Sequence, residues 1–176
     1  MITFRKLWDN HPTISGDDNP CTTKAKKNFQ NQCAIRVGAA LARCGYDTQR
    51  IAGARHCWHH PKTSGHVLAA EELAQGLARV AVPGLAPVER YSSREFMDKA
   101  AGKTGIVFFK DYWHRSQDTQ GSPTGDHIDL WNGARLTDWR SWVHFHMRIG
   151  DIGMHSLSDN ISDYLASEKI WFWRVA

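Results

Sequence analysis

The clearest periodic pattern of apolar residues in the chain runs from Phe29 to Cys44. Apolar side chains recur at spacings of three and four residues, at Phe29, Cys33, Val37, Ala40, Leu41 and Cys44. This spacing is typical of an amphipathic helix with one buried face. Asn31 is a suitable N-cap, and Gly45 is a typical C-terminal signal. The sequence therefore predicts a helix that begins after Asn31 and ends before Gly45, with Cys33 in its first turn.

The remaining segments before residue 103 are predicted to be helices and loops. Residues 1 to 28 contain many Asn, Asp, Pro and Gly residues, which favours an irregular arm with a short opening segment at 4–8. Apolar residues at helical spacing predict two more helices, over 66–80 and 93–101, the second with a serine as its N-cap.

Strand patterns dominate after residue 103. The apolar run 104–110 predicts a buried strand, and strand character resumes at 126–131 and again at 169–175. The Asn132-Gly133 pair predicts a tight turn, after which 134–136 pair back antiparallel. Three further segments complete the prediction: polar loops over 115–125 and 147–163, and a short helix capped by Thr137. Helices first and strands later indicate an α+β fold in which the Cys33 helix packs on an antiparallel sheet.

Composition limits the classes of protein to which the chain can belong. With 176 residues, 41% of them hydrophobic, the chain can bury a sizeable core, and we expect a single domain over 1–176. The net charge of +4 is scattered, which favours a solvated surface over nucleic-acid binding. No run of about twenty apolar residues occurs, so no membrane insertion is expected. The opening residues lack the apolar core of a signal peptide, which predicts synthesis in the cytoplasm.

Cys33 is the first candidate for chemistry. Backbone N–H groups and the helix dipole at a helix N-terminus favour a thiolate over a thiol, which makes such a cysteine a potential nucleophile. The alternative is that Cys33 is a small core residue, since free cysteine is among the most buried residue types.

His127 is the candidate base for that nucleophile. It begins an apolar strand that ends at a turn, so it is expected at an edge of the sheet. A thiolate–imidazole pair also needs a group that orients the imidazole ring. Asp138, beyond the turn, is the favoured orienting residue. Asp129 is the alternative orienting residue, because strand alternation places it on the same face as His127. It is less favoured because its carboxylate is poorly aimed at the ring of its neighbour.

The His/Cys-rich segment 56–60 raises a metal hypothesis, with His66 as the one additional local ligand. Adjacent side chains cannot all point at one ion, so a loop with partly buried Cys57 and Trp58 is favoured, and no metal or organic cofactor is expected. Pairing among Cys21, Cys44 and Cys57 stays open.

Three segments resemble the fourth family of type VI secretion amidase effectors, which belongs to the wider NlpC/P60 papain-like group. They are Asn-Gln-Cys-Ala-Ile-Arg at 31–36, Gly-Asp-His-Ile-Asp-Leu-Trp-Asn-Gly at 125–133 and Ile-Trp-Phe-Trp-Arg at 170–174. The opening segment and the strand at 106–110 also fit, so the resemblance covers nearly the whole chain.

The resemblance implies a peptidoglycan amidase (a DL-endopeptidase) that hydrolyses the γ-D-glutamyl–meso-diaminopimelate bond of stem peptides. Cys33 would be the nucleophile, His127 the general base and acid, and Asp138 the orienting residue. It also implies delivery by the type VI secretion machinery into the periplasm of a recipient bacterium, and inhibition by a cognate immunity protein in the producing cell's periplasm.

The residues around the nucleophile are candidates for stabilising the oxyanion or binding substrate. The backbone N–H of Cys33 is a natural oxyanion donor, and Asn31 or Gln32 can add a side-chain donor. Trp131 is a candidate substrate contact, because tryptophans can line a substrate cleft.

Three other functions are compatible with the sequence. The first is a papain-like protease or deamidase toxin that acts on a protein substrate. The second is a non-catalytic module that binds cell wall or nucleic acid. The third is a metal-dependent hydrolase that uses His56, His59 and His60.

Overall fold

The computed structural model describes residues 1–113, 125–137 and 170–176 of the chain. It contains four α-helices and two short 3₁₀ helices in these residues. The elements in chain order are α1 (Phe4–Asp9), β1 (Thr22–Thr23), β2 (Lys26–Lys27), α2 (Cys33–Arg43), η1 (Thr48–Arg50), η2 (Lys62–Ser64), α3 (Ala70–Arg79), β3 (Glu89–Tyr91), α4 (Ser93–Ala100), β4 (Gly105–Trp113), β5 (Gly125–Trp131) and β6 (Ile170–Arg174).

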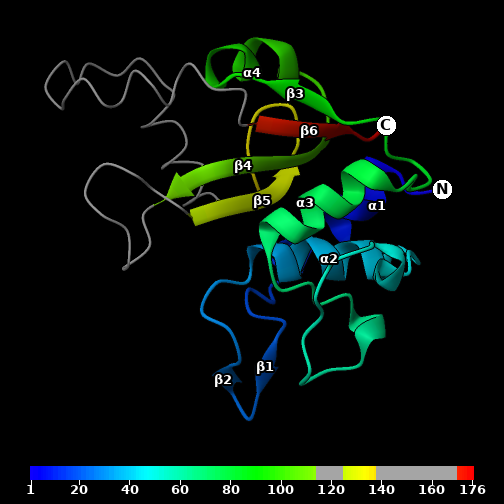
Figure 1. The fold of residues 1–176 in the computed structure, drawn as a ribbon, viewed down its shortest axis with the longest axis vertical. Helices are drawn as coiled ribbons and strands as arrows, with labels where there is room; N and C mark the ends of the chain where they lie inside the picture. The colour runs from blue at the N-terminus through cyan, green and yellow to red at the C-terminus, as the bar shows by residue number, and fades with distance from the viewer. Residues whose placement is uncertain (114–124, 138–169) are drawn as a thin grey trace, which may run out of the picture.

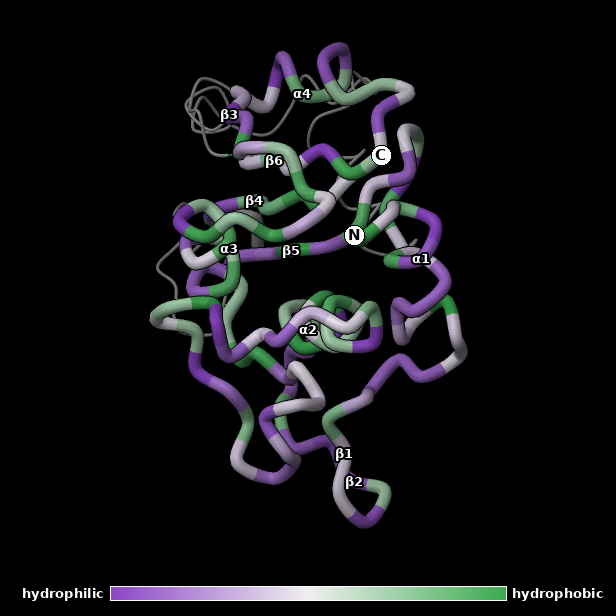
Figure 2. The backbone as a smooth tube through the Cα atoms, turned by 90° about the vertical axis from the view of Figure 1, so that its right-hand side faces the viewer, coloured by the Kyte–Doolittle hydropathy of each residue, from purple (hydrophilic) through white to green (hydrophobic). Residues whose placement is uncertain are grey.

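A four-stranded antiparallel sheet with the strand order β3-β6-β4-β5 forms the centre of the fold. The helix α4 covers one face of this sheet, and α2 and α3 lie on the other (Figure 1). The β1–β2 hairpin lies beyond α2, on the side away from the sheet (Figures 1 and 2). The predicted α+β arrangement, with the Cys33 helix packed on an antiparallel sheet, is confirmed.

The apolar run in β4 is explained by burial of both faces of the sheet. Ile106 and Phe108 belong to the core cluster that includes α2 and α3, whereas Val107 and Phe109 belong to the cluster that includes α4. A strand covered on both faces needs apolar side chains at successive positions, so its sequence does not alternate between apolar and polar residues.

The helix α2 is held between the sheet and the loop that precedes α3. Eight of its eleven residues are buried, which makes it the most buried helix of the described chain. The loop approaches so closely that a Cβ atom on Gly38 would collide with the carbonyl oxygen of Gly65. The helix ends at Arg43, and Gly45 follows with a positive φ of 84°, as the sequence predicted.

Two of the predicted elements differ from the structure. The helix α3 begins at Ala70 instead of residue 66, because Val67 pairs with His56 and the carbonyl of His66 accepts from the N–H of Cys57 at 2.9 Å. After the Asn132-Gly133 turn only one bridge forms, between Trp131 and Leu136, instead of a paired strand.

The other predicted elements are confirmed wherever the structure describes them. The helix at 93–101 appears as α4, where Ser92 and Glu95 form a capping box. The strands predicted near 104, 126 and 169 appear as β4, β5 and β6. The loop predicted over 115–125 reaches the described part only at residue 125, and the loop over 147–163 and the short helix after Thr137 lie outside it.

The sequence analysis gave no indication of β1, β2 and β3, which have only two or three residues each. Across the described residues, no helix is long and apolar enough to cross a bilayer.

Candidate active site

Cys33 is the first residue of α2 and lies against the backbone of β5. Its side chain is largely buried, with 8% of the residue's surface exposed. The backbone N–H groups of Ala34 and Ile128 hydrogen-bond to its sulfur and favour the thiolate. The first turn of α2 therefore directs the thiol at the end strand of the sheet.

His127, on β5, hydrogen-bonds to the Cys33 thiol, and the pKa values of the two groups move apart. Burial alone raises the pKa of the Cys33 thiol, but the hydrogen bond with His127, the imidazolium charge and the backbone donors outweigh it and hold this pKa below its ordinary value. Burial alone lowers the pKa of His127, but hydrogen bonds with Asp129 and Cys33 and their negative charges raise it to about 10. Both shifts favour a thiolate and an imidazolium over a neutral thiol and a neutral imidazole.

Asp129 is the carboxylate that contacts this imidazole in the described structure. Its Oδ2 lies 3.9 Å from Nε2 of His127, and the residue is 3% exposed. Its Oδ1 accepts from the backbone N–H of Leu130 at 2.7 Å and from the hydroxyl of Thr137. Burial alone raises the pKa of Asp129, but the hydrogen bond with His127, the charges of His11 and His127 and the Thr137 hydroxyl lower it below its ordinary value.

His11 is a buried neighbour of this site that the sequence analysis did not identify. Its Nε2 lies 3.7 Å from Oδ1 of Asp129, and only 1% of its surface is exposed. The residue lies in the N-terminal arm, far in sequence from β5, and no periodicity or motif linked the two segments. His11 adds a second imidazole to the surroundings of the carboxylate.

Asn31 and Gln32 take different roles beside the nucleophile. The Oδ1 atom of Asn31 accepts from the backbone N–H of Cys33 at 3.1 Å, although Gln32 occupies the N-cap position. The Gln32 side chain instead turns into the protein, where it accepts from the N–H of Cys21 at 2.9 Å and donates to the carbonyl of Cys21 at 3.1 Å. Asn31 is exposed, and Gln32 is buried.

Of the other two predicted residues, only Trp131 lies in the described part of the chain, and its side chain does not reach the site surface. Trp131 is fully buried, and its Nε1 donates to the carbonyl of Ala100 at 3.0 Å, so its side chain packs in the cluster under α4. Asp138 lies outside the described residues. The hydroxyl of Thr137, the residue before it, donates to Asp129.

The site consists of a buried thiol at a helix N-terminus, next to an imidazole and a carboxylate on a neighbouring strand. This arrangement is suited to nucleophilic attack by the sulfur. The model of the family described as "Type VI secretion system (T6SS), amidase effector protein 4" (Tae4) matches residues 29–173. The chain belongs to this family. It is accordingly a peptidoglycan-targeting antibacterial effector of a type VI secretion system.

Two solved structures are similar to the chain. The type VI effector–immunity complex Tae4–Tai4 from Enterobacter cloacae matches with a TM-score of 0.58 and 18% identity, over 100% of both chains. The Tae4 effector from Enterobacter cloacae matches with a TM-score of 0.56 and 21% identity, over 78% of this chain and 86% of that one. At these identities the likeness establishes the fold. No curated protein sequence matches the chain.

Proposed function

We propose that this effector is a cysteine amidase that hydrolyses the γ-D-glutamyl–meso-diaminopimelate bond of peptidoglycan stem peptides. The observation that carries the proposal is the Cys33–His127 pair, in which a lowered thiol pKa and a raised imidazole pKa supply a nucleophile and a proton donor together. The family is described as one of amidase effectors, and the Cys33–His127 pair provides the nucleophile and the proton donor that amide hydrolysis needs.

In the first half of the reaction, the Cys33 thiolate attacks the γ-carbonyl carbon and the carbonyl oxygen becomes an oxyanion. The Cys33 N–H is one candidate donor to this oxygen, and in the free structure it donates to Asn31. The exposed side chain of Asn31 can add its own amide N–H, whereas the Gln32 amide already donates inside the protein. Among these groups, we therefore favour Asn31 over Gln32 as the side-chain donor.

In the second half, the imidazolium of His127 gives its proton to the departing diaminopimelate nitrogen, and an acyl-enzyme remains on sulfur. Neutral His127 then takes a proton from water, which attacks the thioester and releases the γ-D-glutamyl carboxylate. Cys33 leaves as a thiolate, and the imidazolium is restored. No step needs a metal or an organic cofactor.

Two carboxylates are candidates for orienting His127. Asp138 is the residue that the family resemblance assigns to this role, and that assignment stays a proposal. Asp129 contacts the imidazole and is held in place by Leu130 and Thr137, so we propose that it shares or performs this role.

The proposal extends to the fold family and to the biology. A helix N-terminal cysteine facing a strand histidine on an antiparallel sheet fits a single NlpC/P60-like, papain-like domain over residues 1–176. Because the similar Enterobacter cloacae effector is seen bound to the immunity protein Tai4, we propose a comparable inhibitor for this chain. The effector would act in the periplasm of a recipient bacterium.

The test is digestion of Gram-negative peptidoglycan with the unmutated protein, Cys33→Ala and Cys44→Ala, followed by mass spectrometry of the products. Cys44 is the matched control, because it lies at the other end of α2 and only part of it is buried. We expect loss of tetrapeptide muropeptides and new glycan-linked dipeptides with the unmutated protein and Cys44→Ala alone.

Three results would overturn the proposal. An unchanged muropeptide profile with every protein would favour a protease or deamidase toxin that acts on a protein substrate. Equal digestion by Cys33→Ala would show that Cys33 is not the nucleophile. Toxicity that survives in Cys33→Ala without any digestion would favour a wall-binding module.

A further inference from the structure

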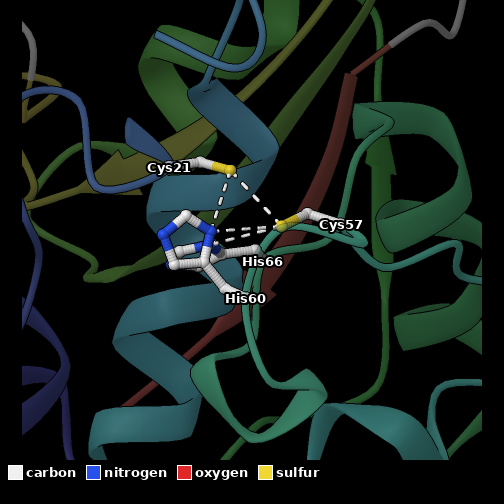
Figure 3. A group of neighbouring side chains, drawn as sticks. All are labelled: Cys21, Cys57, His60 and His66. Atoms are coloured by element: carbon white, nitrogen blue, oxygen red, sulfur yellow. Dashed lines mark hydrogen bonds between the residues drawn. The ribbon is translucent and has the colours of Figure 1, made fainter. Parts of the chain in front are cut away.

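Four sulfur and nitrogen ligands converge on the side of α2 away from the sheet. They come from Cys21, which precedes β1, and from Cys57, His60 and His66, which lie in the segment between η1 and α3 (Figure 3). We call these four residues the Cys/His cluster. Cys21, Cys57 and His66 are buried, and His60 is partly exposed. Neither cysteine is part of a disulfide.

Four distances between ligand atoms of the Cys/His cluster are close to those expected when the atoms bind one tetrahedral ion. Zn–S and Zn–N bonds of ordinary length at a tetrahedral angle place two sulfurs about 3.8 Å apart and a sulfur and a nitrogen about 3.6 Å apart. The two sulfurs are 3.4 Å apart, and Nδ1 of His60 lies 3.5 Å from the sulfur of Cys21 and 3.4 Å from that of Cys57. Nδ1 of His66 lies 3.8 Å from the sulfur of Cys57.

We propose that Cys21, Cys57, His60 and His66 bind a single Zn²⁺ ion through two thiolates and two imidazole Nδ1 atoms. All four ligand atoms lie within 4.8 Å of one another, so one ion can reach all of them with little movement of the chain. Two thiolates and two imidazoles in a tetrahedral arrangement are the ligand set that favours zinc over harder divalent cations.

The sequence analysis expected no metal here, because the contiguous residues 56–60 cannot share one ion. That argument holds for His56 and His59, which point elsewhere: His56 contacts the hydroxyl of Thr48 at 2.9 Å, and the His59 ring packs on Phe29. The fourth ligand is Cys21, which is 36 residues before Cys57 in the sequence. A hydrolytic site made of His56, His59 and His60 does not form.

Metal binding must release the protons of the two thiols. Asn28 prepares for this charge, since its side-chain amide donates to the sulfur of Cys21 at 3.6 Å. A neutral imidazole offers the lone pair of its Nδ1 atom to the ion, and the two thiolates supply the negative charge that balances it.

The proposed site is structural instead of catalytic. Four protein ligands fill a tetrahedral ion and leave no position for water or substrate. The ion would join the segment before β1 to the loop before α3. It would also fix the backbone of Cys21, which the side chain of Gln32 holds at both its N–H and its carbonyl. Gln32 directly precedes Cys33, so an ion at this site would help to hold the segment that carries the nucleophile in place.

The first measurement is an anaerobic titration of reduced, full-length protein with Co²⁺, which reports thiolate and tetrahedral ligation through its absorption spectrum. The protein carries Cys33→Ala, so that the active-site thiol cannot contribute and the result does not depend on enzymatic activity. We expect one cobalt ion per chain, a thiolate-to-cobalt charge-transfer band, the intense visible bands of a tetrahedral ion, and displacement by Zn²⁺.

Ligand variants in the same background assign the site. Cys21→Ser and Cys57→Ser should lose the charge-transfer intensity of one sulfur each and bind at least tenfold more weakly, and His66→Gln should also bind at least tenfold more weakly. Cys44→Ser and His59→Gln are the matched controls, since neither residue belongs to the Cys/His cluster, and both should bind as the parent does. Each variant is first checked for a cooperative melting transition.

A stability measurement supplies a second readout. At one Zn²⁺ concentration the ion should raise the Tm of the parent by more than that of Cys21→Ser; His60→Gln, at the partly exposed ligand, serves if Cys21→Ser does not fold. A folded, reduced parent without a tetrahedral cobalt spectrum would overturn the proposal. So would a spectrum that persists unchanged in Cys21→Ser, or a Cys21–Cys57 disulfide that forms in the presence of saturating Zn²⁺.

Discussion

Oδ2 of Asp129 lies 3.9 Å from Nε2 of His127, although the two residues are separated by a single position on one strand. Alternation puts both side chains on the same face of β5, and the length of the imidazole brings its far nitrogen to the carboxylate. Hydrogen bonds from Leu130 and Thr137 hold the carboxylate in place. A same-strand neighbour can thus fill the position of a ring-orienting acid.

Asp129→Asn should reduce kcat/KM by on the order of 100-fold or more, since the imidazolium loses its hydrogen-bonded anion. The same change should lower the pKa of His127 and thereby weaken the thiolate form of Cys33. Steady-state kinetics on a soluble stem peptide, combined with an NMR titration of the His127 ring, would measure both effects.

Asp138→Asn is the comparison that divides the two candidates. If Asp129 alone orients the ring, Asp138→Asn keeps the parental rate and His127 titration. If Asp138→Asn loses most of the activity and Asp129→Asn keeps the parental rate, the orienting role belongs to Asp138 instead. Loss in both variants would mean that the two carboxylates act together.

The charge state of Cys33 predicts a specific dependence on pH. Because its pKa is lowered and that of His127 is raised to about 10, the ion pair exists between these two values. Activity should rise as pH increases through the lowered thiol pKa and fall as pH passes about 10, where the imidazolium loses its proton. The ultraviolet absorbance of the thiolate, compared between the parent and Cys33→Ser, should follow the acidic limb.

His127→Ala should move that absorbance to higher pH. Without the imidazolium, burial of the thiol is no longer outweighed, so the Cys33 pKa should rise. Burial raises the pKa of the Cys21 and Cys44 thiols, so these two groups do not add to the thiolate absorbance at neutral pH. An unchanged thiolate titration in His127→Ala would show that the helix N-terminus alone sets the charge of Cys33.

Gln32→Ala should destabilise the protein and reduce activity, although its side chain faces away from the proposed oxyanion. The substitution leaves the buried N–H and carbonyl of Cys21 without their partner, which costs roughly 1–3 kcal/mol. For a chain of this length, we expect Tm to fall by roughly 2–4 °C for each kcal/mol. Calorimetry and steady-state kinetics would measure the two effects.

Gln30→Ala is the matched control for this prediction, because Gln30 is exposed in the same segment. It should keep both the parental Tm and the parental rate. If Gln32→Ala keeps a parental Tm but loses activity, Gln32 contributes directly to catalysis and the structural role assigned to it here is wrong.

The elements with a strong local signal were predictable from the sequence. The helix α2 combines apolar periodicity with Gly45, and α4 begins at a capping box, so both could be located by local rules. The short strands of the sheet and hairpin have no such signal. Their pairing depends on partners far away in the chain, as when Glu89 pairs with Phe172.

Pattern reasoning also had limits at the site. Cys33 and His127 could be selected, because each residue type stands at an element position that suits its chemistry. Trp131 was expected near substrate, but its large apolar ring and one N–H are satisfied inside the core by Phe96 and the carbonyl of Ala100. His11 and Cys21 reach their neighbours only through tertiary packing, which no spacing rule records.

The position of β6 has a consequence for how the molecule acquires its structure. This strand comes last among the described elements, yet it lies inside the sheet, between β3 and β4. The sheet therefore cannot close until β6 has been synthesised, and pairings between such distant segments form slowly. Until β6 is available, β3 and β4 lack the strand that joins them, so the four-stranded sheet is incomplete.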